Sequence, residues 1–399
     1  MRLLEHQSKK LLSTFGLVFT ESTPVESIDE VRATVERVGL PVVLKAQTPF
    51  GGRGHAGAVK FAETLDQAVI AAEALLGMTV RGTTVDVISI EPKLNYEREF
   101  YVGITWDTVE KLPVALLSLA GGMDVESSQS DQVAHQPFDP WMGLAPYKAR
   151  GLAAEVGLTG RILVAVGEVL TKLSQAFLDC DAVTMEINPL VVTKDETLIG
   201  LDARVEIEDE AVYRQGERLE PLGELTMTAT GRPPTALELE AQRIDAIDHR
   251  GVAGRVVEFD GDLALLIGGG GASLTVFDAI KAHGGSPANY CEVGGNPTEE
   301  KVAAITSLLL SKPGVNGMAV IMNVVNNTRA DVIARGVLMG VEGTGRKPSE
   351  TISLFRVPGN WETEAREIME AAGVEVHGRE VSLDAAARLA VERNRAHVA

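Results

Sequence analysis

The chain has few cysteines, few aromatic residues and no long apolar run. Its two cysteines, Cys180 and Cys291, form no CxxC pair and no zinc-ligand spacing, which predicts buried free thiols and a cytoplasmic location. Aromatic residues make up 5% of the 399 residues, too few to suggest a platform for stacking nucleic-acid bases. Because no run of ~18 apolar residues occurs, the sequence predicts no contact with the membrane interior.

Basic residues are also scarce. With 37 Lys and Arg against 56 Asp and Glu, the formal net charge is -19, and no basic stripe is present to neutralise nucleic-acid phosphates. A nucleotide needs only a local pocket and stays compatible with this balance. The sequence has no Walker A loop, since residues 340–345 precede Arg346-Lys347-Pro348. It also lacks an HExxH motif and a nucleophile elbow, so it does not support a catalytic nucleophile within this chain.

The chain has two halves that differ in the pattern of their predicted helices and strands. The first half mixes helices, expected at 28–38, 64–76 and 160–177, with antiparallel strand pairs, so it is typical of an α+β domain. A stretch rich in Gly and Pro at 228–235 marks a boundary. Beyond it, short apolar strands at 263–267, 288–291, 317–323, 351–355 and 374–376 alternate with helices, which predicts a doubly wound parallel sheet. The fold class is therefore α/β.

Three oxygen-bearing side chains mark two adjacent apolar strands of the first half. Glu186 and Asn188 begin the run 186–193, and Asp202 follows in 200–204, so we expect all three at strand ends. Magnesium prefers such hard oxygen ligands and keeps coordination positions for substrate phosphates. A β-hairpin with its polar ends in water explains the isolated segment equally well.

A glycine-rich loop at 51–57 follows Lys45, which ends the apolar run 42–44. Glycines let backbone amides approach phosphate oxygens, and Lys45 and Arg53 supply charge. Glycine loops are common without a ligand, but Lys45 favours a phosphate site here, although a snorkelling surface lysine is the alternative. Glu91 and Glu99 could accept hydrogen bonds from a nucleotide or lie at solvated strand ends.

Turns rich in Gly and Asn follow three strands of the second half, at 268–273, 294–299 and 323–329. Each leads from a strand into a helix, and the amino end of a helix favours anions. In a parallel sheet the three turns would share the carboxyl edge, where ligands bind. Ordinary strand-to-helix turns are the alternative. The first turn lacks the last glycine of GxGxxG, so dinucleotide binding is only weakly indicated.

Taken together, these motifs resemble the β subunit of succinyl-CoA synthetase over nearly the whole chain. The resemblance implies an ATP-grasp domain at 1–235 and a flavodoxin-like domain at 245–399. It places the glutamate that steadies the phosphohistidine on Glu186 and the Mg²⁺ ligands on Asn188 and Asp202. Its nucleotide contacts fall on the following residues: Lys45, Gly52, Arg53, Gly54, Glu91 and Glu99.

In that family ATP, or GTP as the alternative, phosphorylates a histidine of a separate α subunit, which also binds CoA. An acyl phosphate then forms from the carboxylate, and CoA displaces the phosphate. The resemblance therefore implies a hetero-oligomer, αβ or (αβ)2, with the covalent intermediate on the partner.

The sequence departs from the succinate-specific pattern in the carboxylate pocket. Gly268 stands where that subfamily has asparagine, and Asn326-Asn327-Thr328 replaces a Gly-Gly-Ile-Val turn. These segments are similar to the β portion of ATP-citrate lyase and citryl-CoA synthetase, and residues 121–126 also resemble malate-CoA ligase. The acid is thus a di- or tricarboxylate. A non-catalytic nucleotide-binding regulatory subunit would not need Asn188 and Asp202, and a stand-alone ATP-grasp ligase would need no partner.

Overall fold

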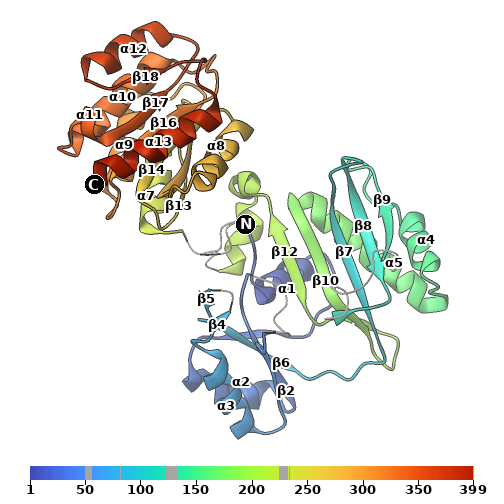
Figure 1. Ribbon diagram of the computed structural model, residues 1–399. Coiled ribbons are helices and arrows are strands. Elements are labelled where there is room, and N and C mark those ends of the chain that lie inside the picture. The colour runs from blue at the N-terminus through green and yellow to red at the C-terminus, as the bar shows by residue number, and fades with distance from the viewer. Residues whose placement is uncertain (50–55, 81, 123–132, 224–231, 233, 399) are drawn as a thin grey trace. The chain divides into compact units, whose positions relative to one another are not determined.

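The computed structural model describes residues 1–399 except 50–55, 81, 123–132, 224–231, 233 and 399. The chain divides into two units, Met1–Pro233 and Pro234–Ala399 (Figure 1). Each unit has its own hydrophobic cores. Across the described ranges, no helix is both long and apolar enough to cross a membrane. Helices and sheets occur together in both units, which confirms the predicted α/β class.

The first unit contains a small sheet with the strand order β1-β6-β2-β3, all neighbours antiparallel. Its core is formed with α2 and α3 by buried valine, leucine and alanine side chains. The hydroxyl of Thr64 accepts a hydrogen bond from the Gln67 backbone and so begins α3. The elements of this part are α1 (Glu5–Ser13), β1 (Thr23–Val25), α2 (Ile28–Val38), β2 (Val42–Ala46), β3 (Val59–Ala62), α3 (Leu65–Leu75), β4 (Thr79–Val80), β5 (Thr83–Thr84) and β6 (Ile88–Pro92).

A larger antiparallel sheet completes the first unit, with the order β11-β10-β7-β8-β9 and with β12 paired to β10. Helix α5 packs on it through Leu170, Leu173 and Phe177, whose spacing puts them on one helical face. The remaining elements are β7 (Arg98–Asp107), β8 (Leu112–Ser118), β9 (Val133–Pro137), α4 (Pro146–Glu155), α5 (Gly160–Asp179), β10 (Ala182–Val192), β11 (Leu198–Gly200), β12 (Ala203–Ile207), η3 (Asp209–Arg214), α6 (Gly216–Leu219) and η4 (Glu220–Leu222).

The second unit has one sheet with the order β13-β15-β14-β16-β17-β18. From β14 onward all neighbours are parallel and follow the order 2-1-3-4-5 of flavodoxin-like folds, as predicted. The edge strand β13, antiparallel to β15, was not predicted. The strands are β13 (Val252–Glu258), β14 (Leu263–Gly268), β15 (Asn289–Gly294), β16 (Gly317–Met322), β17 (Ile352–Arg356) and β18 (Val376–His377).

Helices cover both faces of this sheet. Leu263, Leu265 and Ile267 pack with α8 and α13, whereas Ala264 and Leu266 pack with α9, α10 and α12, as the period of two in a strand requires. Helix α7 packs on β13 and belongs to this unit, although the sequence-based bounds left it between the domains. The helices are α7 (Ala236–Asp245), α8 (Gly271–Ala282), α9 (Glu299–Ser311), α10 (Ala330–Gly343), α11 (Pro348–Thr351), α12 (Glu362–Ala371) and α13 (Leu383–Val398).

Candidate functional site

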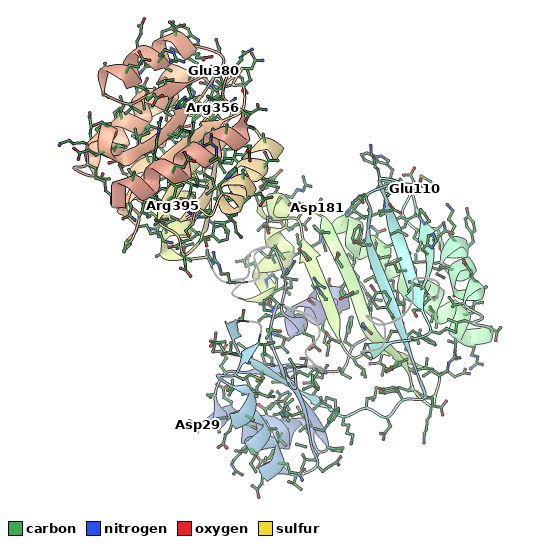
Figure 2. All side chains as sticks on the ribbon, in the orientation of Figure 1. Asp29, Glu110, Asp181, Arg356, Glu380 and Arg395 are labelled. Carbon is green, nitrogen blue, oxygen red and sulfur yellow. The ribbon has the colours of Figure 1, made fainter. Side chains whose placement is uncertain are left out.

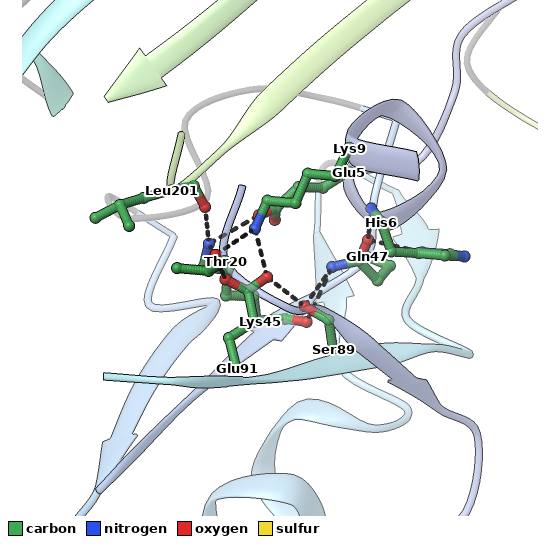
Figure 3. A network of polar contacts seen from close by, with 9 residues as sticks. All are labelled: Glu5, His6, Lys9, Thr20, Lys45, Gln47, Ser89, Glu91 and Leu201. Atoms are coloured by element: carbon green, nitrogen blue, oxygen red, sulfur yellow. Dashed lines mark hydrogen bonds and ion pairs between the residues drawn. The ribbon is translucent and has the colours of Figure 1, made fainter. Parts of the chain in front are cut away.

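Lys45 lies within a buried network of charges in the first unit (Figure 3). It belongs to β2, and its ammonium nitrogen Nζ lies 2.7 Å from Glu5 Oε1 and 3.1 Å from Glu91 Oε2. The same nitrogen donates a hydrogen bond to the carbonyl oxygen of Leu201, the residue before Asp202. Lys45 therefore links the small sheet to the segment that leads into β12.

A second buried lysine shares the same carboxylates. Lys9 of α1 places its Nζ 2.8 Å from Glu5 Oε1 and 2.7 Å from Glu91 Oε1. Thr20 donates its hydroxyl to Glu91 Oε2 at 2.9 Å, and Ser89 donates to Oε1 at 3.4 Å. Both oxygens of Glu91 thus have donors within the protein, and a nucleotide would have to displace one of these donors to bond to Glu91.

Lys45 stays charged in spite of its burial. Burial by itself lowers the pKa of a lysine, because a cation loses its hydration in the protein interior. At Lys45 the carboxylates of Glu5, Glu91 and Asp202 outweigh this effect and raise its pKa above the ordinary value. A buried, charged ammonium suits an anionic ligand such as a phosphate.

Asn188 and Asp202 lie side by side. The backbone nitrogen of Asn188 donates to the carbonyl oxygen of Asp202 at 3.2 Å, and the adjoining residues Ile187 and Ala203 are partners in the β10–β12 register. The side-chain oxygen Oδ1 of Asn188 accepts a hydrogen bond from the Gly122 nitrogen at 2.6 Å, and Nδ2 donates to the Gly122 oxygen at 3.1 Å. An amide oxygen has two lone pairs, so one remains for a metal ion.

Like Asn188, Glu186 lies inside β10, not at the strand end that the sequence suggested for both. Its Oε2 accepts a hydrogen bond from the Tyr101 hydroxyl at 3.1 Å, and its Oε1 lies 3.6 Å from Nη1 of Arg204. Burial raises the pKa of Glu186, an effect that Arg204 and Tyr101 oppose and the Asp202 carboxylate reinforces. This carboxylate is oriented from both neighbouring strands.

Glu99 lies next to the turn that holds Asn188. Its Oε2 accepts a hydrogen bond from the Tyr96 hydroxyl at 3.1 Å. A Cβ atom on Gly122 would lie 3.2 Å from Glu99 Oε1, and the φ of +65° at this position favours glycine, so the turn passes close to this carboxylate. Through Gly122 the structure therefore brings Glu99 and Asn188 together. The expected phosphate-loop residues Gly52, Arg53 and Gly54 lie outside the described residues.

In the second unit, the three predicted turns are bonded to one another at the carboxyl edge of the sheet. The nitrogen of Asn323 donates to the Gly268 oxygen at 3.0 Å, and that of Asn296 donates to the Thr328 hydroxyl at 3.3 Å. The nitrogen of Gly270 donates to a Glu292 oxygen at 2.7 Å. Since the strands β15, β14 and β16 are neighbours in this order, the turns form one continuous rim.

The predicted acid-binding residues of this rim differ in their exposure to solvent. Gly268 and Thr328 are buried, whereas Asn326 and Asn327 are exposed. The backbone oxygen of Asn326 accepts a hydrogen bond from the Asn360 side chain at 3.0 Å. The exposed asparagines are therefore accessible to a ligand, while the buried residues shape the turns.

Sequence reasoning missed Arg356, which ends β17 at the same edge (Figure 2). Its side chain is only 5% exposed, and it donates through Nη1 to the Met322 oxygen and through Nε to the Val381 oxygen, both at 2.6 Å. Burial lowers the pKa of Arg356, and the charges of Glu380 and Glu362 oppose this shift. The signal was present, because Arg356 ends an apolar run just as Lys45 does.

Two different protein-family models match the chain, one in each unit. A model of the ATP-grasp domain matches residues 2–192, and a model of the ATP citrate lyase citrate-binding region matches residues 235–392.

Individual relatives match almost the whole chain. The β subunit of the ADP-forming succinate–CoA ligase from Rubrobacter xylanophilus is 35% identical, covering 97% of both chains. The corresponding subunit from Natronomonas pharaonis is 32% identical, covering 98% of both chains. A solved structure of ATP citrate lyase from Methanothrix soehngenii, in complex with citrate and coenzyme A, is 22% identical, covers 98% of this chain and 99% of that chain, and has a TM-score of 0.78. At this identity the structural likeness shows a shared fold.

Proposed function

The chain belongs to the family of the β subunits of ADP-forming succinate–CoA ligases, and on that premise we propose how it binds nucleotide and acid and with which partner it acts. It is a subunit of a carboxylate–CoA ligase. The observation that supports the proposal most directly is Lys45, a buried ammonium kept charged by carboxylates next to the Asn188–Asp202 pair. The partner is an α subunit that supplies the phosphorylated histidine and the CoA site, in an αβ or (αβ)2 assembly.

The first unit binds ATP, or GTP as the alternative. Lys45 contacts the phosphates together with the loop residues Gly52, Arg53 and Gly54. Glu99, next to the Gly122 turn, accepts hydrogen bonds from the sugar or the base. Such a site accelerates phosphoryl transfer by positioning and by neutralising charge, so the chain needs no nucleophile of its own.

Asn188 and Asp202 would hold a Mg²⁺ ion. Their oxygens have the chemistry this ion prefers, and two protein ligands suffice where substrate phosphates complete the coordination. When bound, the ion would neutralise charge on the transferred phosphoryl group. The hydrogen bonds between Asn188 and Gly122 hold the carboxamide in one orientation.

Glu186 acts on the partner's histidine. Its carboxylate, held by Tyr101 and Arg204, accepts a hydrogen bond from the imidazole nitrogen that is not phosphorylated and so stabilises the positive charge on that ring. A carboxylate that orients an imidazole in this way fixes its tautomer as well as its direction.

The second unit contributes to the site of the acid. Gly268, Asn326, Asn327 and Thr328 surround the carboxylate groups, and Arg356 supplies charge to the same edge of the sheet. An arginine can bind a carboxylate through two parallel hydrogen bonds. Succinate is the first candidate. The match to a citrate-binding region over residues 235–392 favours citrate as the second, with malate as a further dicarboxylate.

Two observations bear on the remaining alternatives. A non-catalytic regulatory subunit would not need the side-chain oxygens of Asn188 and Asp202, so the presence of both residues, joined by a backbone hydrogen bond, favours catalysis. Both cysteines are free and buried, which supports a cytoplasmic location. A stand-alone ligase would be active without the α subunit.

The test is a CoA-ligase assay of the chain co-expressed with its α subunit, comparing succinate, citrate and malate under ATP and GTP. Asp202→Ala should abolish phosphorylation of the partner's histidine and leave the fold intact. Asp86→Ala, which removes an exposed carboxylate of the same unit, is the matched control and should retain full activity. Activity of the chain alone, or full phosphorylation by Asp202→Ala, would contradict the proposal.

A further inference from the structure

We propose that Lys9 and Glu91 are positioning residues. They determine how strongly the protein's carboxylates compete with the phosphates of a bound nucleotide for the Lys45 ammonium. The inference rests on the proposed function, because it assumes that Lys45 meets those phosphates. It gives Glu91 an indirect role through Lys45, in place of a direct contact with the base or ribose.

The four charged side chains of the network form a balanced set of two cations and two anions. Their exposed fractions are 3% for Glu5, 3% for Lys9, 8% for Lys45 and 2% for Glu91. Lys45 is thus the most accessible member and the one able to face a ligand. Among the described residues, Lys9 Nζ contacts Glu5, Glu91 and Thr20.

Lys45 must exchange a contact when a phosphate arrives. An ammonium has three hydrogens to donate, and Nζ already meets acceptors on Glu5, Glu91 and Leu201. The Glu91 contact, at 3.1 Å, is longer than the 2.7 Å contact to Glu5 and is the one most easily given up.

Lys9 lowers the free-energy penalty of this exchange. A buried carboxylate that loses its cation is strongly destabilised unless another charge or hydrogen bond replaces it. When Lys45 turns to the phosphate, Glu91 keeps Lys9 at 2.7 Å and Thr20 at 2.9 Å. If Lys9 were absent, Lys45 would be the single cation shared by Glu5 and Glu91. The two carboxylates would then bind Lys45 more strongly and compete with the ligand for it.

The experiment is a double-mutant cycle on the full chain with Lys9→Met, Glu91→Gln and the double variant. The dissociation constants of ADP and of inorganic pyrophosphate are measured by titration calorimetry. Lys9→Met should weaken both ligands by about tenfold or more, whereas Glu91→Gln should tighten both. The double variant, in which the charges balance again, should return to within about threefold of the original chain.

Thr20→Val is the matched control, because it removes one hydrogen bond from Glu91 and one from Lys9 without changing any charge. It should alter either dissociation constant by less than Lys9→Met does, because the balance of charges is kept. Circular dichroism and thermal unfolding establish that each variant is folded. If Lys9→Met does not fold, Glu91→Gln decides alone: tighter binding of both ligands supports the proposal, and any other result overturns it.

Additive losses in the double variant would show that Lys9 and Glu91 act only on the fold, and would overturn the proposal. A Glu91→Gln variant that loses affinity for ADP but not for pyrophosphate would identify a direct contact with the nucleoside, and would also overturn it. If the unmodified chain binds neither ligand, the proposed function fails as well. If it binds both, and the double variant stays as weak as Lys9→Met, only this inference fails.

Discussion

Gly103 leaves the space through which Tyr101 reaches Glu186. Glu186 on β10 is the register partner of Gly103 on β7 and of Arg204 on β12. A Cβ atom on Gly103 would lie only 2.6 Å from the Tyr101 hydroxyl oxygen, well inside van der Waals contact. The clashing atom is the far end of a side chain, so in Gly103→Ala we expect the ring to move while the strand stays in place. The substitution should thus break the hydrogen bond between Tyr101 and Glu186.

The size of the effect follows from that bond, which joins a hydroxyl to a carboxylate at 3.1 Å. Hydrogen bonds to charged groups contribute about 1.5–3 kcal/mol. If the bond orients Glu186 during phosphoryl transfer, Gly103→Ala should slow phosphorylation of the partner's histidine by about 10- to 150-fold. The affinity for ADP should stay unchanged, because neither Gly103 nor Tyr101 is among the described contacts of Lys45.

The assay measures the rate of histidine phosphorylation with labelled ATP, alongside the dissociation constant of ADP. Tyr101→Phe should show the same loss, and the double variant Gly103→Ala, Tyr101→Phe should lose no more than either single one, since all three lack the same bond. Gly151→Ala is the control, because a Cβ on this residue of α4 meets no atom within 4 Å. An unchanged rate in Gly103→Ala would refute the reasoning, and so would a loss of ADP affinity.

Three further outcomes follow from the structure. Arg356→Lys should raise the KM for the acid by about tenfold, since lysine lacks the fork that binds carboxylates, without changing ADP affinity; an unchanged KM would exclude Arg356 from the acid site. Burial raises the pKa of Cys180 to about 11 and also raises that of Cys291, so a disulfide reagent at about pH 8 should label neither thiol until the chain is unfolded, and labelling of the native chain would contradict their burial. Hydrogen bonds from Arg214 hold the pKa of Asp181 below its ordinary value. The charged carboxylate therefore stabilises the fold at pH values above its ordinary pKa, and this stabilisation is lost as the pH falls through the folded-state pKa. Asp181→Asn should therefore lower the unfolding temperature at neutral pH, by an amount that shrinks as the pH falls below about 4, whereas a difference independent of pH would contradict this.

The sequence predicted the parallel sheet of the second unit because its strands are buried apolar runs bounded by glycine. The strand expected at 263–267 is Leu263–Gly268, and the others agree in order and direction. The edge strand β13 was missed because it is half-exposed and contains Gly254 and Arg255, so no apolar run marks it. A Cβ on Gly254 would lie 2.2 Å from the Ala241 oxygen of α7, so this glycine is required by packing that a strand pattern does not reveal.

The site was predicted in part. The adjacency of the segments around Glu186 and Asp202 is confirmed by the pairing of β10 with β12. Glu186 was expected at a strand end because the apolar run 186–193 begins with it. Instead, β10 begins at Ala182 and continues past Pro189 through a shift of register between Ile187 and Leu190. The local sequence could not show that the partner strand accommodates such a shift.

Lys9 escaped notice for a different reason. In the sequence, Glu5 and Lys9 are spaced four residues apart, as an ion pair on the exposed face of a helix would be. In the structure this face of α1 is buried, and its charges meet those of β2 and β6. Only tertiary packing distinguishes a solvated pair from a buried network.

A charge at the end of an apolar strand therefore marks a buried ion without identifying its partner. Lys45, Glu91 and Arg356 share this pattern, and each is at most 8% exposed. What separates them is the number of donors left after the contacts within the protein are made. Lys45 uses all three of its donors on protein acceptors, whereas Arg356 uses two of five on the described carbonyl oxygens. A nucleotide must then compete with Glu91 for Lys45, while an acid can bind Arg356 without displacing a protein group, so changes in the network around Lys45 should alter nucleotide affinity and leave the affinity for the acid unaffected.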